Sequence, residues 1–439
     1  MQQCDILIFA GWCIPVEPTA TVHADCAVAI NDGRIVDILP GANARQQYRA
    51  GVTVNRPNHV LIPGLVNAHT HAAMTLFRGL ADDMPLERWL QQVIWPAEQR
   101  WLSVEMVRDG SKLAIAEMLR AGITCFSDQY FFPETVAETA ADSHMRAMVG
   151  TPVVEFENPW SKSAADAISK GTDRVHDRYA DHPLISSCFA PHSTAAVSND
   201  AFHELRVVAD QLDCPVQIHL HESAAEITES IERTGMRPIE VLADLGMLNS
   251  SLLAVHAVHV TDADLEAFAA SGVNVAHCPR SNLKLADGFA PVSRMLDHGI
   301  NVSLGTDGAA SNNVLDLLGE MRTAALIGKA LANDAQALAT GQVLRMATLG
   351  GARALGLADS VGSIEIGKWA DLTCIDLNRL HSQPVYDPLS QIVYTANAEQ
   401  VSDVWVAGRH LLDDGELTHI DRRDVLKRAA EWQQKISGQ

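Results

Sequence analysis

Histidine and carboxylate residues recur at short spacings in four separate segments of this 439-residue chain. Two histidines at positions i and i+2 share one face of a strand, so one such pair can present two imidazoles to a metal ion. Imidazole and carboxylate are ligands of tetrahedral zinc. A single His-x-His pair is a weak signal, but four segments that together carry such ligands favour a bound metal. The segments are His69-Thr70-His71, His219-Leu220-His221-Glu222, His256-Ala257-Val258-His259 and Gly305-Thr306-Asp307-Gly308.

These segments fall at the ends of predicted β-strands. From Ile62 onward, short apolar runs alternate with stretches of helical character such as 107–121, 200–212 and 262–271. Eight such strand–helix units close most naturally into a parallel barrel, whose active site lies at the carboxyl ends of the strands. An open doubly wound sheet is the alternative, and the positions of the histidines favour the barrel. The predicted strands are 61–68, 123–128, 145–154, 184–191, 215–221, 252–260, 273–279 and 300–307.

Both ends of the chain are rich in β-forming residues. The runs 4–11, 26–32 and 33–40 precede the barrel, and 368–377 and 401–412 follow it. The simplest arrangement is one small β domain assembled from both termini. We therefore predict an α/β fold with a barrel over 62–365 and a second domain built from 1–61 and 366–439.

Composition excludes several classes of protein. The chain has 54 acidic and 33 basic residues, a net charge of −21, which argues against nucleic acid or an anionic membrane as a partner. Eight scattered cysteines without a C-x-x-C pair are typical of reduced, buried thiols in a cytosolic protein. Because the N-terminus lacks a basic region and no apolar run approaches 18 residues, we expect neither a secretory signal nor a membrane span, and a cytoplasmic location.

The chain resembles the amidohydrolase superfamily along its whole length, through the motifs PGLVNAHTHAAMTLFRG, HLHES, VHAVH, CPRSNLKL and GTDGAASNN. It looks most like the adenosine-type deaminases of the 5′-methylthioadenosine/S-adenosylhomocysteine group, whose relatives include chlorohydrolases of s-triazines. The resemblance implies a distorted (β/α)8 TIM-type barrel, a β-sandwich from both termini and one divalent metal per subunit, usually zinc. It assigns the metal to His69, His71, His219 and Asp307.

The resemblance also implies catalytic roles for three residues. Asp307 would accept a proton from the attacking water, and Glu222 would act as the general acid that protonates N1 of a purine. His256 would hydrogen-bond the oxygen added at C6. The family pattern H-x-x-E selects His219, and the first histidine of VHAVH selects His256. We expect structural roles for the neighbouring His221 and His259.

One metal is expected rather than two. Two-metal members of the superfamily carry a carbamylated lysine at the end of strand four. This chain has no lysine between Lys170 and Lys284, and strand four ends in Cys188-Phe189-Ala190-Pro191-His192.

Substrate contacts are expected from the loops. The segment 82–99 reads as amphipathic, with Trp89 and Trp95 over the barrel mouth, and the resemblance implies that Glu98 binds ribose hydroxyls. His192 would reach the ribose or the purine. The loop 155–163 lacks the arginine that some relatives place there, so the preferred 5′ substituent stays open. Ser281 and Asn282 line the pocket or form the turn after strand seven, and the turn role is favoured.

The sequence thus favours a zinc-dependent hydrolase that deaminates an adenosine-type nucleoside, such as 5′-methylthioadenosine, S-adenosylhomocysteine or adenosine. We also expect a homo-oligomer. One alternative is a hydrolase of the same fold acting on a chlorotriazine, guanine or pterin, which offers Glu98 no ribose. A second is a non-catalytic metal-binding barrel. An acid such as Glu222 beside the ligands argues against the second alternative, since a structural zinc site is closed by protein ligands.

Overall fold

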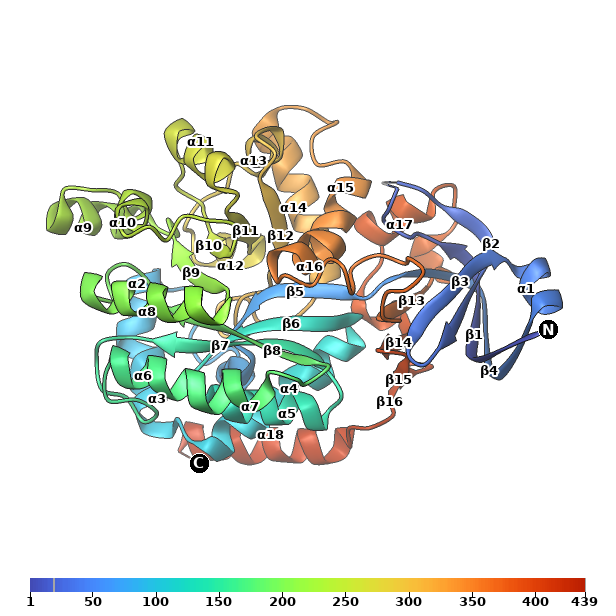
Figure 1. The fold of residues 1–439 in the computed structure, drawn as a ribbon, viewed down its shortest axis with the longest axis horizontal. Helices are drawn as coiled ribbons and strands as arrows, with labels where there is room; N and C mark the ends of the chain where they lie inside the picture. Colours follow the sequence, from blue (N-terminus) through green and yellow to red (C-terminus); the bar gives the residue numbers. More distant parts are fainter. Residues whose placement is uncertain (19, 439) are drawn as a thin grey trace. The chain divides into compact units, whose positions relative to one another are not determined.

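The central feature of the molecule is a sheet of eight strands that neighbour one another in chain order (Figure 1). The computed structural model describes residues 1–18 and 20–438, and residues 19 and 439, which belong to the predicted terminal segments, lie outside the described residues. The strands are β5 (Leu65–Thr70), β6 (Ile123–Gln129), β7 (Arg146–Val153), β8 (Ile185–Pro191), β9 (Val216–Leu220), β10 (Leu252–His256), β11 (Asn274–His277) and β12 (Asn301–Leu304).

The first and last strands of this sheet meet at their carboxyl ends. The backbone N–H of Asp307, just after β12, donates to the carbonyl oxygen of His69 in β5 at 3.0 Å. The hydroxyl of Thr70 donates to the carbonyl oxygen of Asp307, also at 3.0 Å. Strand pairs from β7 to β12 are parallel. The predicted barrel is therefore confirmed.

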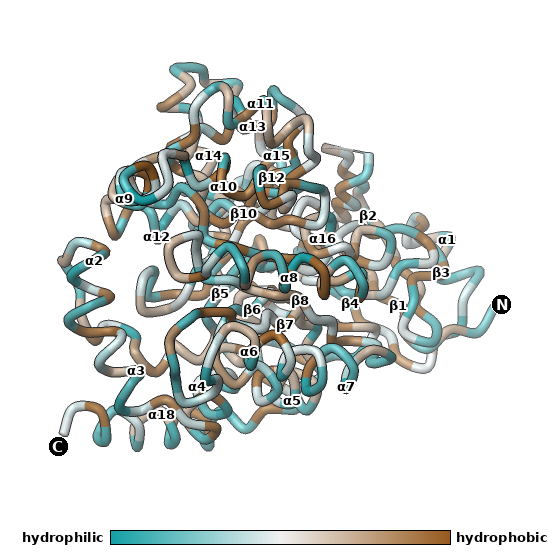
Figure 2. Tube along the Cα trace, turned by 60° about the vertical axis from the view of Figure 1, so that its left-hand side comes forward, coloured by the Kyte–Doolittle hydropathy of each residue, from teal (hydrophilic) through white to brown (hydrophobic). Residues whose placement is uncertain are grey.

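Helices cover the outside of the barrel strands, as in α5, α6 and α7 against β7 and β8 (Figure 1). Every residue of β5, β6 and β7 is buried, because parallel strands in a barrel are covered on both faces. Figure 2 shows the apolar strands and the largely polar outer helix α9. The α-helices of the described residues are α1 (Gly41–Gln47), α2 (Leu86–Trp89), α3 (Trp95–Trp101), α4 (Val104–Arg120), α5 (Pro133–Asp142), α6 (Ala164–Gly171), α7 (Asp177–Tyr179), α8 (Asn199–Leu212), α9 (Ala224–Thr234), α10 (Pro238–Asp244), α11 (Asp262–Ser271), α12 (Pro279–Lys284), α13 (Val292–Asp297), α14 (Leu317–Ala332), α15 (Thr340–Arg345), α16 (Gly351–Ala354), α17 (Pro388–Tyr394) and α18 (Arg422–Ser437).

A second sheet joins both ends of the chain, in the order β16-β15-β14-β13-β4-β1-β2-β3. Its strands are β1 (Gln2–Cys13), β2 (His23–Asn31), β3 (Arg34–Pro40), β4 (Tyr48–Pro63), β13 (Leu372–Asp376), β14 (Val401–Val406), β15 (Arg409–Asp413) and β16 (Glu416–Leu417). The strands from the C-terminal part of the chain join those from the N-terminal part through β13, which runs antiparallel to the end of β4 with Leu372 opposite Pro63. Ile8, Val28 and Trp405 are among the side chains of its core. The β domain from both termini is confirmed, and the ranges 1–61, 62–365 and 366–439 stay a prediction.

The chain forms two compact units. One contains Ala68–Ile115, Phe126–Leu315 and the chain from Arg422 onward, and it includes all the candidate site residues. The other contains Met1–Asn67, Ala116–Cys125 and Asp316–Asp421. All eight cysteines are buried free thiols, as predicted. Within the described residues, the helices are too short or too polar to cross a membrane.

Several strand boundaries differ from the predicted ones. The predicted strand 61–68 is two elements, because Leu61–Pro63 complete β4 and the barrel strand β5 begins at Leu65. Proline lacks a backbone donor, and Gly64 follows it, which separates the two strands. The predicted strands ending at 221, 260 and 307 are too long, because β9, β10 and β12 end at Leu220, His256 and Leu304. The backbone turns to a left-handed conformation at His221 (φ 55°), directly after β9, and at His256 (φ 74°), the last residue of β10.

Candidate metal centre and active site

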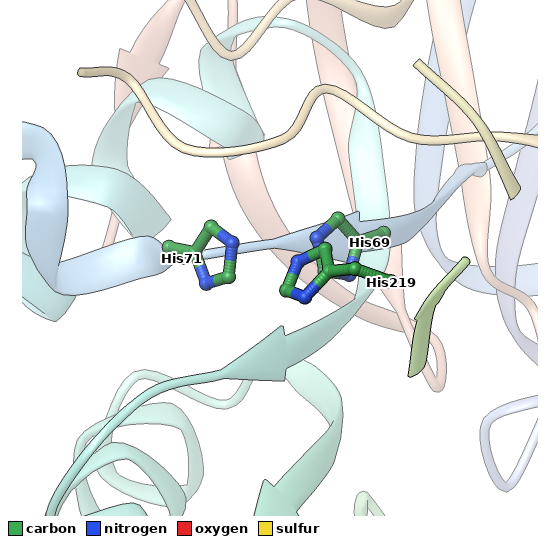
Figure 3. Close-up of side chains that lie close together, drawn as sticks. All are labelled: His69, His71 and His219. Carbon is green, nitrogen blue, oxygen red and sulfur yellow. The ribbon is translucent and has the colours of Figure 1, made fainter. Parts of the chain in front are cut away.

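Three histidines from two barrel strands converge at the carboxyl end of the barrel. His69 and the adjacent His71 come from β5 and its end, and His219 comes from β9; each offers a ring nitrogen within 4.8 Å of the others. Figure 3 shows the three rings gathered around one small volume. The ring centres of His69 and His71 are 4.8 Å apart, and those of His69 and His219 are 5.0 Å apart. The two-residue period of a strand thus brings both histidines of the first pair to the cluster.

The second nitrogen of each ring is already engaged. Nδ1 of His71 lies 2.5 Å from the backbone carbonyl oxygen of Gln129, and Nδ1 of His219 lies 2.9 Å from that of His192. Nδ1 of His69 lies 3.4 Å from the side-chain carbonyl oxygen of Gln217. Donation from Nδ1 leaves Nε2 unprotonated, which is the form that binds a metal. The buried Nε2 of His69 has no hydrogen-bond partner. These residues therefore fit a divalent cation.

Asp307 completes the cluster from the end of β12. Its Oδ1 lies 3.2 Å from Nε2 of His71 and 3.6 Å from Nε2 of His69. Its Oδ2 accepts hydrogen bonds from the hydroxyls of Ser281 and Ser311, both at 2.6 Å. Burial alone would raise the pKa of Asp307, but the two histidines outweigh burial and hold the pKa well below its usual range. Asp307 is therefore a carboxylate with one oxygen facing the imidazoles.

Glu222 and His256 lie together beside this cluster. Nε2 of His256 is 3.4 Å from Oε1 of Glu222, whose side chain is 17% exposed. Burial, and then the charges of Asp287 and Asp307, raise the pKa of Glu222 well above its usual value. Burial lowers the pKa of His256 to about 3. The site therefore favours the protonated form of Glu222 and the uncharged form of His256, the states required of a proton donor and a neutral hydrogen-bonding group.

Glu98 lies on a continuous helical segment formed by α2, a π-helical turn (Leu90–Ile94) and α3. The hydroxyl of Tyr130, just after β6, donates to Oε1 of Glu98 at 2.7 Å, and the ring of Tyr130 is 6.5 Å from that of His71. Burial raises the pKa of Glu98 to about 7. The loop before this segment is held by an ion pair between Asp82 and Lys284 at 2.6 Å.

The remaining predicted substrate residues occupy different environments. His192 follows β8, its ring centre is 4.9 Å from that of His219, and burial lowers its pKa to about 4. Of the two tryptophans, Trp89 is buried and Trp95 is 45% exposed. His192 therefore lies beside the histidine cluster, whereas one of the two tryptophans is buried and the other is exposed.

His221 and His259 lie outside the cluster. Nε2 of His221 accepts a hydrogen bond from the backbone of Ile239 at 3.2 Å, and Nε2 of His259 is 2.7 Å from the carbonyl oxygen of Asp287. Although His219 and His221 have the His-x-His spacing, they do not share a strand face, because β9 ends at Leu220 and the backbone at His221 is left-handed.

The turn role favoured for Ser281 and Asn282 is also wrong. Both residues lie on α12, where Ser281 binds Asp307 and the amide of Asn282 is 3.0 Å from Nδ1 of His256. In the loop 155–163, which lacks the arginine of some relatives, the side-chain oxygen of Asn158 accepts hydrogen bonds from the backbone N–H groups of Trp160 and Ser161. Asn158 therefore bonds within its own loop.

Sequence reasoning missed residues that support the site. Gln217 is two positions before His219, so the strand period was a usable signal for it. Asp287 and Tyr130 lie in loops, where no periodicity marks them.

Comparisons with known proteins agree with this geometry. The Amidohydrolase family model matches residues 60–411. The chain is 45% identical to a 5-methylthioadenosine/S-adenosylhomocysteine deaminase of Teredinibacter turnerae, over 98% of each chain. It is 44% identical to the protein of the same name from Saccharophagus degradans, over 99% of this chain and 97% of that one. A crystal structure of an adenosine deaminase from Xanthomonas campestris with bound zinc is 47% identical, covers all of both chains and has a TM-score of 0.99. With a family match across most of its length and relatives this similar, the chain belongs to the amidohydrolase family.

Proposed function

We propose that this protein is a zinc-dependent aminohydrolase that converts an adenosine-type nucleoside to its 6-oxo product and ammonia. The proposal rests above all on one observation, the convergence of His69, His71, His219 and Asp307 beside Glu222, whose pKa burial raises. The names of the relatives, which are adenosine or 5-methylthioadenosine/S-adenosylhomocysteine deaminases, support the substrate class.

The three histidines and Asp307 would hold the zinc ion. When bound, zinc supplies Lewis-acid activation of water, lowering its pKa toward about 7. Asp307, a carboxylate held low in pKa by its histidine neighbours, accepts the proton of the attacking water. Glu222 delivers a proton to N1 of the purine as oxygen adds at C6. His256 contributes a hydrogen bond to the added oxygen. The proton held by Asp307 passes to the amino group, which leaves as ammonia, and the proton of the added hydroxyl returns to Glu222 as the C6 carbonyl forms.

We propose that Glu98 and His192 bind the substrate. A carboxylate accepts hydrogen bonds from both vicinal hydroxyls of a ribose, and Glu98 has Tyr130 fixing one of its oxygens. His192 is uncharged and borders the ring of His219, where it can contact the nucleoside without competing for the metal. Glu222 and Asp307 complete the set that faces the reacting base.

A homo-oligomer in the cytoplasm is also proposed. The eight buried thiols without a disulfide support a reducing compartment. Light scattering on the purified protein tests the oligomeric state, and fractionation of the source cells tests the location.

Release of ammonia from the zinc-loaded protein tests the proposed function. The panel contains adenosine, 5′-methylthioadenosine, S-adenosylhomocysteine, free adenine, guanine and a pterin, with chloride release followed for a chlorotriazine. We expect turnover of the three adenosine compounds to exceed that of the other compounds. Turnover confined to guanine, the pterin or the chlorotriazine, with one zinc bound, would contradict the proposal while leaving the metal centre intact.

A further inference from the structure

Asn282 is a buried amide that contacts His256 from the side opposite the reacting groups. It lies on α12, immediately after β11, and is 1% exposed. Its Nδ2 is 3.0 Å from Nδ1 of His256, which is also 1% exposed. On the other side of that ring, Nε2 faces Glu222 at 3.4 Å. The two ring nitrogens of His256 thus have different neighbours.

The chemistry of an amide determines which nitrogen carries the proton. A side-chain NH2 group only donates, so Nδ1 of His256 must accept and the single proton of the neutral ring lies on Nε2. In that tautomer the ring donates toward Glu222 and the space in front of it. In the other tautomer, Nε2 would be a bare acceptor and could not donate to an added oxygen.

The orientation of the amide is itself constrained. Burial raises the pKa of Asp287 to about 7, and a hydrogen bond from the side chain of Asn282 opposes that rise. The backbone N–H of Asp287 donates to the carbonyl oxygen of Asn282 at 2.9 Å, which keeps the two residues together. Rotating the amide by 180° would turn its oxygen toward the carboxyl of Asp287 and lose the donor to His256. The NH2 group therefore serves both neighbours.

The backbone of His256 is fixed as well. His256 and Ala257 are both left-handed, with φ of 74° and 47°, and the N–H of Ala257 donates to the carbonyl oxygen of Leu220 at 3.0 Å. This hydrogen bond holds the backbone next to His256 against the end of strand β9.

We propose that Asn282 is a positioning residue that holds His256 in the tautomer protonated at Nε2, so that this nitrogen donates to the oxygen added at C6. The catalytic consequence rests on the proposed function, whereas the tautomer itself does not.

The direct test is the tautomer of His256 in the zinc-loaded wild type. Protein labelled with ¹⁵N-histidine gives distinct nitrogen signals for a protonated and a bare ring nitrogen, and the signals missing from His256→Asn identify the residue. We expect a protonated Nε2 and a bare Nδ1. Protonation at Nδ1 instead would overturn the proposal, and this measurement needs neither a folded Asn282 variant nor an active enzyme.

Two substitutions test the consequence. In Asn282→Asp, a carboxylate can only accept, so it favours a proton on Nδ1. We expect kcat to fall on the order of 10²–10³-fold, comparable to loss of an oxyanion donor, while KM changes by less than about threefold. Asn282→Leu removes the donor without imposing the opposite tautomer, and we expect a smaller loss, roughly 10- to 100-fold.

Asn274→Asp is the matched control, because Asn274 is a buried asparagine at the start of β11 whose Nδ2 binds the carbonyl oxygen of Ser250. We expect it to keep the wild-type rate. A variant Asn282→Leu with a raised KM, an unchanged kcat and the wild-type tautomer would overturn the proposal and assign Asn282 to direct substrate binding. If the wild type deaminates no nucleoside, the proposed function fails, while the NMR result still decides the tautomer.

Discussion

Replacement of Glu222 by glutamine tests the proton donor with little change in shape. Glutamine keeps the side-chain length, and its NH2 group can still hydrogen-bond N1, but it holds no transferable proton. The contact of 3.4 Å with His256 can be retained. Because Glu222 does not belong to the cluster of metal-binding nitrogens, the zinc content should remain at one per chain.

The expected loss follows from the environment of the carboxyl group. General acid catalysis contributes about 10²–10⁴ in rate. Burial and the charges of Asp287 and Asp307 raise the pKa of Glu222 and so favour its protonated form, which carries the proton that the substitution removes. We therefore expect the upper part of that range, a fall in kcat on the order of 10³-fold or more. At about 1.4 kcal/mol for each factor of ten, this is about 4 kcal/mol of transition-state stabilisation.

The assay is steady-state ammonia release, with zinc content measured on the same samples. Glu229→Gln, on the exposed side of α9, makes the same change of residue type away from the site and should behave as wild type. If Glu222→Gln keeps more than about a tenth of the wild-type kcat with full zinc, Glu222 is not the general acid, since loss of the acid is expected to cost at least about 10²-fold. Loss of zinc from this variant would equally refute the reasoning, because it would make Glu222 part of the metal centre.

Further outcomes are expected for three substitutions and for the pH dependence of the wild type. His69→Ala removes a buried ligand nitrogen, so zinc affinity should fall by at least about 100-fold in a chelator competition, and unchanged affinity would contradict the ligand assignment. Glu98→Ala should raise KM for nucleosides by roughly 10- to 100-fold and leave KM for free adenine unchanged, and equal losses on both would remove the ribose contact. Since the pKa of Glu98 is about 7, KM of the wild type for nucleosides should rise as the pH is lowered from 8 to 6, when the carboxylate becomes protonated. Arg56→Met leaves the fully buried Asp403 without its two hydrogen bonds of 2.7 and 2.8 Å, so unfolding by denaturant at pH 7 should require about 3–5 kcal/mol less. Burial alone would raise the pKa of Asp403, but His410, Arg56 and Ser402 lower it below its ordinary value of 3.8. The ionised Asp403 therefore stabilises the folded protein above about pH 4, and this stabilisation is lost progressively as the pH falls further. The difference in unfolding free energy between the wild type and Arg56→Met should accordingly shrink at pH 3.

The barrel could be predicted from the sequence because its signals are local and repeated. Alternating apolar runs and helical stretches mark each unit, and α11 occupies the predicted residues 262–271. The start of α11 is set by Thr261 and Asp264, whose side chains bind each other's backbone N–H in a capping box. The four residues TDAD contain both partners of this capping box. Short-range rules of this kind need no tertiary information.

The interior of the site could be predicted only in part. The positions of His69, His71 and His219 follow from strand periodicity. The direction of the His221 side chain depends instead on the left-handed backbone conformation of that residue, which a histidine can adopt but does not require. Asn282 and Asp287 reach the site from a helix and a loop after β11, across contacts that no sequence period encodes. Such placements depend on the three-dimensional path of the chain.

The helical segment that carries Glu98 has a consequence for how this protein could change over evolution. The proposed metal ligands lie at or near the carboxyl ends of barrel strands, where a backbone hydrogen bond from Asp307 to His69 closes the sheet. Glu98 lies on an insertion between β5 and α4, held by contacts such as Tyr130 and the pair of Asp82 with Lys284. The proposed recognition of the sugar and the proposed activation of the base thus lie on different parts of the polypeptide. A segment grafted over residues 82–101 that preserves these two contacts is the natural starting point for engineering a new substrate onto the same reaction.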